Sequence, residues 1–264
     1  MRTANRLVSA AGVLAAGACV LAVSACATML EVSVETPLKA KLDVSAFSRV
    51  LVAGFVAGGS EDVDANLETA RLLRNQLKSK SGLKVVDADV LSLIDVAGRM
   101  NASGPAPGAD NAPPSLEIPK VVKEDRDLQA FDPLFANAAY WKKLGDEYQS
   151  PLIVTGTVMF TPHATTGYVQ QEHEVYDTFG RRQVVPVRTY MERKGFILRP
   201  KFIFIDGRTG AVLHTETFRE EVLYSAEQST PALSTYFELM DRLVPAFLST
   251  LSAQTIKGSR YLLR

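Results

Sequence analysis

The first 26 residues constrain this chain most, because they indicate which part of it folds and in which compartment. Arg2 and Arg6 give a positively charged start, and a largely apolar run extends from Leu7 to Val23. The small residues Ser24-Ala25 follow it. This is the layout of a secretory signal peptide, and the run is short for a membrane span, which needs about 20 predominantly apolar residues. We therefore expect residues 1–25 to be removed on export.

A cysteine stands directly after these small residues. The string Val23-Ser24-Ala25-Cys26 resembles a bacterial lipoprotein signal, which is cleaved ahead of a cysteine that is then acylated. The resemblance implies lipidation of Cys26 and attachment to the lipid bilayer, each buried methylene contributing about 0.8 kcal/mol. Ala27, rather than aspartate, follows the cysteine, and by analogy with lipoprotein sorting this favours the periplasmic side of the outer membrane. The alternatives are a plain signal peptide and cleavage ahead of Cys19, which would leave too short an apolar run.

The placement of the cysteines also limits the mature chain. Cys19 and Cys26 are the two cysteines of the sequence, so the domain beyond them has no thiol for a disulfide, a nucleophile or a zinc site. Its stability must come from an ordinary hydrophobic core. The 29 basic residues include Arg2 and Arg6, so 27 remain against 29 acidic residues, a balance of about −2. Proteins that bind nucleic acid usually carry a clear basic excess, and we expect no such partner.

Hydrophobic periodicity predicts an α/β (α+β) fold, namely a mixed β-sheet with helices packed on it and a protruding β-hairpin. The expected strands and helices are strands at 48–55, 84–87, 151–160, 196–205 and 211–218, and helices at 65–79, 90–97, 132–148 and 230–251. Asp64 or Asn66 suits the start of the first long helix, and Asp132 with Pro133 the start of another. Pro245 lacks an amide donor, so we expect the last helix to kink or break there.

These elements predict four regions along the chain: a signal peptide (1–25), a lipidated tether (26–46), a single α/β domain (47–252) and a carboxyl-terminal tail (253–264). The domain contains a Pro/Gly-rich insertion (98–128), which we expect to form a surface loop, and a hairpin (167–193) about Gly180-Arg181. A turn centred on these two residues would set Glu172 opposite Arg188, and this pairing is a hypothesis.

The order of the elements resembles a periplasmic α/β module shared by the curli-secretion lipoprotein family and the amino-terminal domain of the Tol-Pal propeller protein. The resemblance rests on Val50–Phe55, Leu67–Val86, Ser150–Thr157 and Ile205–Leu213. That family includes a secretion channel whose subunits contribute hairpins to a shared membrane barrel. The hairpin 167–193 departs from it, because neither set of alternate residues in its first strand is apolar throughout, as a lipid-facing strand requires.

Other constellations favour structural roles. His163, His173 and His214 are scattered over different segments without a cysteine partner, so we expect no metal site and no cofactor. Gly58-Gly59-Ser60 lacks the pattern of a phosphate-binding loop, and the acidic residues after it would repel phosphate. Trp141 lies on an apolar helical stripe and is expected in the core.

No Gly-x-Ser-x-Gly elbow of a hydrolase is present in the sequence. We therefore expect a non-catalytic binding or scaffold lipoprotein of the cell envelope. The hairpin 167–193 and the insertion 98–128 are its expected surfaces for an envelope protein partner or for self-association, because an edge strand offers unpaired amides and carbonyls. Two alternatives remain: an oligomeric subunit of an envelope export assembly, and an envelope hydrolase.

Overall fold

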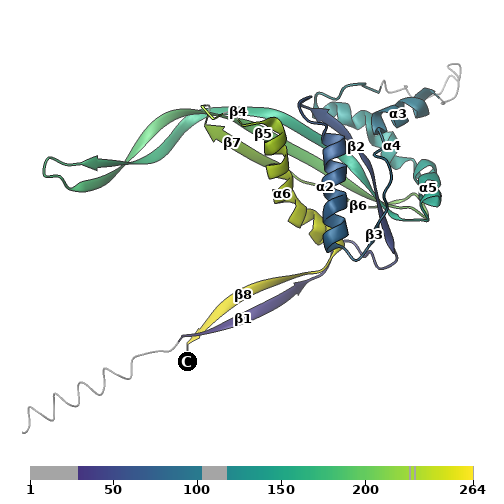
Figure 1. The fold of residues 1–264 in the computed structure, drawn as a ribbon, viewed down its shortest axis with the longest axis horizontal. Coiled ribbons are helices and arrows are strands. Elements are labelled where there is room, and N and C mark those ends of the chain that lie inside the picture. Colours follow the sequence, from purple (N-terminus) through teal and green to yellow (C-terminus); the bar gives the residue numbers. More distant parts are fainter. Residues whose placement is uncertain (1–28, 103–117, 226, 229, 264) are drawn as a thin grey trace, which may run out of the picture. The chain divides into compact units, whose positions relative to one another are not determined.

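The computed structural model describes residues 29–102, 118–225, 227, 228 and 230–263 (Figure 1). Contacts divide them into two units, one formed by strands β1 (Met29–Leu38) and β8 (Gln254–Leu263) and the other by residues 40–252. β1 and β8 pair antiparallel, with Leu38 opposite Gln254. The segments expected as tether and tail therefore contain strands that we did not expect.

Residues 40–252 are built on one mixed sheet with the strand order β3-β2-β4-β5-β6, and β7 also pairs with β5. Its strands are β2 (Arg49–Gly59), β3 (Lys84–Val85), β4 (Leu152–Tyr176), β5 (Arg182–Asp206), β6 (Val212–Thr217) and β7 (Glu220–Ser225). β2 runs parallel to β3 and β4, whereas β5 runs antiparallel to β4, β6 and β7. The expected fold class is confirmed, and β7 is a strand that we did not expect.

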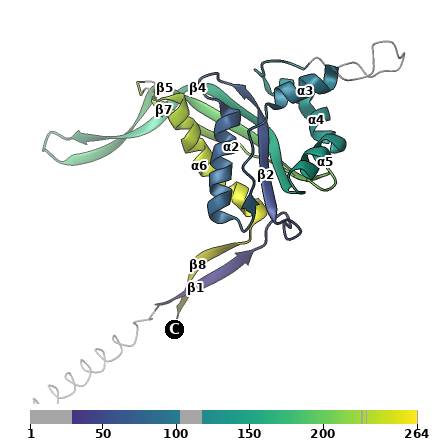
Figure 2. The ribbon, with the colours of Figure 1, turned by 45° about the vertical axis from the view of Figure 1, so that its right-hand side comes forward.

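We call the sheet without the outer part of the β4–β5 hairpin the inner sheet. Helices cover both of its faces (Figures 1 and 2). One face packs against α2 (Ala65–Lys80) and α6 (Ala232–Leu251). The other packs against α3 (Leu93–Ala102), a 3₁₀ helix η1 (Asp125–Phe131), α4 (Asp132–Ala136) and α5 (Ala138–Glu147). A strand covered on both faces needs apolar residues at consecutive positions, which explains the run at the start of β2.

Gly54 lies at an irregularity in β2. The strand's register with β4 shifts between Val52 and Gly54. Because of this shift, Phe55 faces the same α2–α6 side of the sheet as Val50 and Val52, although it follows Val52 by three residues. Gly54 has φ of 151°, and a Cβ placed on it would come within 2.4 Å of the Leu91 carbonyl oxygen. Only glycine fits this close approach of two backbones.

Two helix starts test the expected caps. The Asp64 carboxylate accepts a hydrogen bond from the Leu67 amide at 3.0 Å, which confirms it as the cap of α2. The helix expected over 132–148 is instead split at Asn137, whose side chain accepts from the Tyr140 amide at 3.0 Å and starts α5. Asp132 makes no side-chain cap, so that prediction was wrong, although Pro133 lies in the first turn of α4 as expected.

Two further expectations concern irregular backbone. Helix α6 continues through Pro245, so the helix is not broken there. The expected insertion 98–128 includes the end of α3 and the start of η1, and those parts are helical rather than loop. Residues 103–117 of the insertion lie outside the described residues.

β4 and β5 form a single long hairpin, and the expected hairpin 167–193 is its outer part. Tyr176 lies opposite Arg182, so the turn is centred on Phe179 rather than on Gly180-Arg181. Arg188 therefore lies opposite Gln170, and Glu172 lies opposite Pro186. The hypothesised pairing of Glu172 with Arg188 is wrong, because the true centre of the turn moves each partner by two positions.

Candidate interaction site

The outer hairpin, residues 167–193, is called the ribbon below. In the inner sheet, β4 has a second neighbour, β2, which stops pairing at Phe160, and β5 has β7, which starts pairing at Arg193. Between these points and the turn, β4 and β5 pair only with each other among the described residues, and the ribbon extends past the helices (Figure 1). Both of its edges therefore carry amides and carbonyls that no described strand uses.

The ribbon's turn is held by one carboxylate. Asp177 Oδ1 accepts hydrogen bonds from the amides of Phe179 and Arg181, each at 2.9 Å, and Oδ2 pairs with the Arg181 guanidinium at 2.8 Å. The hydrogen bond from the Arg181 amide makes the largest contribution to holding the pKa of Asp177 below its ordinary value. Gly180 supplies the positive φ of 74° that this turn requires. Phe179 is left 81% exposed at the tip.

The two faces of the ribbon differ in charge, because alternate residues of paired strands point to opposite sides. Over the paired residues 167–175 and 183–191, one face carries no Asp, Glu, Lys or Arg, and we call it the uncharged face. Its residues are Gly167, Val169, Gln171, His173, Val175, Gln183, Val185, Val187, Thr189 and Met191. Five of these ten are aliphatic valines or methionine, so this face offers apolar contact with few polar groups to desolvate.

The opposite face of the ribbon mixes tyrosines with charges. Tyr168 and Tyr190 lie opposite each other with ring centroids 5.4 Å apart, and their side chains are 75% and 60% exposed. Further out, the Arg182 guanidinium pairs with Glu174. Exposed pairs of this kind contribute about 0–1 kcal/mol to stability. Covering their charged groups would cost more desolvation than covering the uncharged face.

A pocket of about 330 Å³ lies at the base of the ribbon. Its lining residues come from β4, β5, β7 and the segment before α6: Pro162, His163, Ala164, Lys194, Gly195, Phe196, Tyr224, Gln228 and Thr230. His163 Nε2 lies 3.4 Å from the Glu221 carboxylate. The described lining holds no serine, which the hydrolase alternative would need beside a histidine and a carboxylate.

The other residues considered from the sequence are distributed through the fold. His173 lies on the uncharged face of the ribbon, and His214 lies on β6, 3.5 Å from Glu216. In the part of the chain that the structure describes, no group of three or more His, Cys, Asp or Glu residues is placed to hold a metal ion. Trp141 is fully buried, and its indole N–H donates to the Leu134 carbonyl at 2.9 Å, which confirms its core position.

Cys26, the predicted lipidation site, lies outside the described residues. None of the described helices combines the length and hydropathy that a membrane span requires. The position of the uncharged face could not be derived from one strand, since it depends on the register of β5. The alternation of Val185, Val187 and Thr189 in the return strand was the signal available in the sequence.

Neither a family model nor a curated protein matches the sequence. Among solved structures, the chain is similar to a PelC dodecamer variant from Paraburkholderia phytofirmans, with 13% identity, a TM-score of 0.37, and coverage of 85% of this chain and 100% of that one. It is also similar to the lipoprotein GNA1162 from Neisseria meningitidis, with 12% identity, a TM-score of 0.32, and coverage of 76% and 98%.

Proposed function

We propose that this protein is a lipoprotein of the bacterial cell envelope, anchored through Cys26 to the periplasmic side of the outer membrane, that binds a protein partner without catalysing a reaction. The anchor rests on the signal-like first 26 residues. The binding role rests on one structural observation, the ribbon with its two unpaired edges and its uncharged face. No nucleic acid and no cofactor is part of the proposal.

The exposed apolar side chains support a binding role for the ribbon. Of the thirteen large hydrophobic side chains that are exposed among the described residues, eight belong to it: Tyr168, Val175, Tyr176, Phe179, Val184, Val185, Val187 and Tyr190. Concentrated exposed apolar surface marks interaction sites in soluble domains. A lone two-stranded ribbon is also only marginally stable in water, so a partner that covers it would stabilise it.

The free edges indicate how a partner would bind. An extended segment can add to an edge strand through main-chain hydrogen bonds, while its side chains contact one face of the sheet. Pro186 has no amide to donate, so the edge of β4 offers a longer uninterrupted ladder than the edge of β5. We infer that the partner contacts the uncharged face and pairs along β4.

Two neighbouring valines provide a matched test of this site. Val185 is on the uncharged face and 41% exposed, whereas Val184 is on the opposite face and 50% exposed. We expect Val185→Arg to reduce the yield of crosslinked partner from intact membranes at least tenfold, because it places a charge in an apolar contact. Val184→Arg should keep at least half of the yield. Equal yields for both variants and the parent chain would contradict a binding role for the uncharged face.

The ribbon's edges also favour a second candidate, an oligomeric subunit of an envelope export assembly, because an unpaired edge can pair with another copy of itself. Detergent-resistant oligomers, or rings in negative-stain images, would support this candidate. A crosslinked product that contains a different protein, with a monomeric chain in detergent, would support the scaffold role instead.

A further inference from the structure

The chain enters and leaves the larger unit, residues 40–252, at one place. The amide of Leu42, two residues after its start, donates a hydrogen bond to the Thr250 carbonyl at 2.9 Å. Thr250 lies in the last turn of α6, two residues before the unit ends at Ser252. The first and last segments of the unit are thus hydrogen-bonded to each other.

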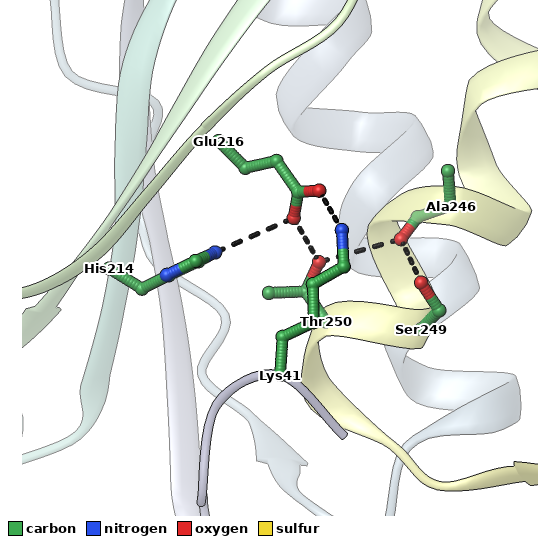
Figure 3. Close-up of polar contacts among 6 residues, drawn as sticks. All are labelled: Lys41, His214, Glu216, Ala246, Ser249 and Thr250. Carbon is green, nitrogen blue, oxygen red and sulfur yellow. Dashed lines mark hydrogen bonds and ion pairs between the residues drawn. The ribbon is translucent and has the colours of Figure 1, made fainter. Parts of the chain in front are cut away.

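The carboxylate of Glu216, on β6, contacts both segments (Figure 3). Its Oε1 forms an ion pair with the ammonium of Lys41 in the entering segment. Its Oε2 accepts a hydrogen bond from Thr250 Oγ1, in the leaving segment, at 2.6 Å. Each of the two oxygens of the Glu216 carboxylate therefore holds one segment: Oε1 holds the entering segment and Oε2 the leaving segment.

The surroundings of Glu216 make its charge important. Its side chain is 14% exposed and Thr250 is fully buried, whereas Lys41 is half exposed. Burial alone raises the pKa of Glu216, but the hydrogen bonds from Lys41 and Thr250 and the Lys41 charge outweigh burial and hold that pKa below its ordinary value of 4.5. Removing a partner from a buried charged group costs more than the same change at the surface, because the remaining group stays desolvated.

The remaining groups around this carboxylate are few. His214, also on β6, places Nε2 3.5 Å from Glu216 Oε2. From α6, Ser249 is turned away, since its hydroxyl donates to the Ala246 carbonyl at 2.6 Å (Figure 3). Among the described neighbours of Glu216, Lys41 therefore provides the positive charge of the ion pair and Thr250 provides the hydroxyl that donates a hydrogen bond.

We propose that Glu216 is a clasp that keeps the entering and leaving segments of the domain folded onto β6. Loss of its charge releases both segments, and loss of one partner releases the segment to which that partner belongs. This device does not depend on the identity of the partner of the ribbon.

Hydrogen exchange measured by mass spectrometry on the purified full-length chain tests the clasp, with peptides covering 40–47, 246–253 and the buried strands β2 and β4. Glu216→Gln keeps the size of the side chain and removes its charge. We expect at least tenfold faster exchange at both the entering and the leaving segment, with β2 and β4 changed less than twofold. Asp87→Asn is the matched control, because the Lys78–Asp87 pair, at 2.7 Å, is exposed and remote from both segments in the sequence. It should leave all four regions unchanged.

Two further variants divide the clasp. Lys41→Met should accelerate exchange mainly in 40–47, and Thr250→Val mainly in 246–253, because each removes one of the two contacts. These variants also carry the test if Glu216→Gln does not fold. Unchanged exchange at either segment in Glu216→Gln would overturn the proposal, as would equal acceleration in β2 and β4, which would mean a general loss of stability. If Lys41→Met and Thr250→Val each leave their own segment unchanged, the proposal is also overturned.

Discussion

The phenolic oxygen of Tyr236 lies 2.5 Å from the hydroxyl oxygen of Thr69, which joins α6 to α2 inside the core. Burial strongly raises the pKa of Tyr236, so the phenol is neutral and serves as a hydrogen-bonding group. Thr69 also donates to the Ala65 carbonyl at 2.5 Å. This link orients the two helices that cover one face of the sheet.

Tyr236→Phe should lower the free energy of unfolding by about 1 kcal/mol, the typical value of one hydrogen bond, because Thr69 keeps its bond to Ala65. Urea unfolding followed by circular dichroism measures the change. Tyr168→Phe is the control, since Tyr168 is exposed on the ribbon and should change the unfolding free energy by less than about 0.5 kcal/mol. A loss for Tyr236→Phe no larger than for this control would argue against the buried link.

Gly54→Ala should destabilise the fold by more than about 2 kcal/mol, because its φ of 151° and the Leu91 carbonyl oxygen leave no space for a Cβ. Thermal unfolding compares it with Gly98→Ala in α3, where no atom beyond the adjacent residues and the helix's own backbone lies within 4 Å of the added Cβ. Alanine favours a helix over glycine by up to about 1 kcal/mol, so the control should gain stability. Equal midpoints for the two variants would contradict the close packing of β2 against Leu91.

Asp206 should make a pH-dependent contribution to stability. Burial raises its pKa, but hydrogen bonds from the Arg208 side chain and amide outweigh burial and lower the pKa from 3.8. A carboxyl group with a lowered pKa in the folded state stabilises the fold above its unfolded pKa and loses that effect as pH falls through the folded value. The difference in unfolding free energy between the parent chain and Asp206→Asn should therefore be constant above about pH 5 and shrink below pH 3.8. A difference that grows towards acid would mean the opposite shift.

Cys26→Ala should move the protein from the membrane to the soluble periplasmic fraction, because the acylated thiol is the proposed anchor. Fractionation with immunoblotting measures the distribution, and mass spectrometry of the parent chain measures the acyl mass on the first mature residue. Cys19→Ala is the matched control and should leave membrane partitioning unchanged. If Cys19→Ala releases the protein from the membrane and Cys26→Ala does not, the anchor is Cys19 and the proposed site is wrong.

Most of the inner sheet could be predicted from sequence, because its strands are covered on both faces and are apolar at consecutive positions. Val50, Val52 and Ile153 are of this kind, and all are fully buried. The cap at Asp64 was also readable, since a side chain that bonds its own backbone acts locally. Asn137 offered the same signal, but the apolar spacing on either side of it favoured one continuous helix.

What could not be predicted depends on contacts between distant segments. β1 alternates Val32 and Val34 with exposed Glu31 and Ser33, yet its pairing with β8 joins opposite ends of the chain. The clasp at Glu216 likewise brings Lys41 within bonding distance across 175 positions of sequence. An error of one residue at the centre of the turn moved every cross-strand partner in the ribbon by two positions, which misplaced the pairs but kept each residue on its own face.

β4 and β5 are each 25 residues long and pass without a break from the buried sheet to the tip at Phe179. Any partner that grips the tip therefore pulls on the very strands that form the centre of the domain. A pull along their axis loads in shear, many at once, the hydrogen bonds that join β4 to β2 and β5 to β6 and β7. A force applied at the tip is therefore carried by the sheet at the centre of the domain.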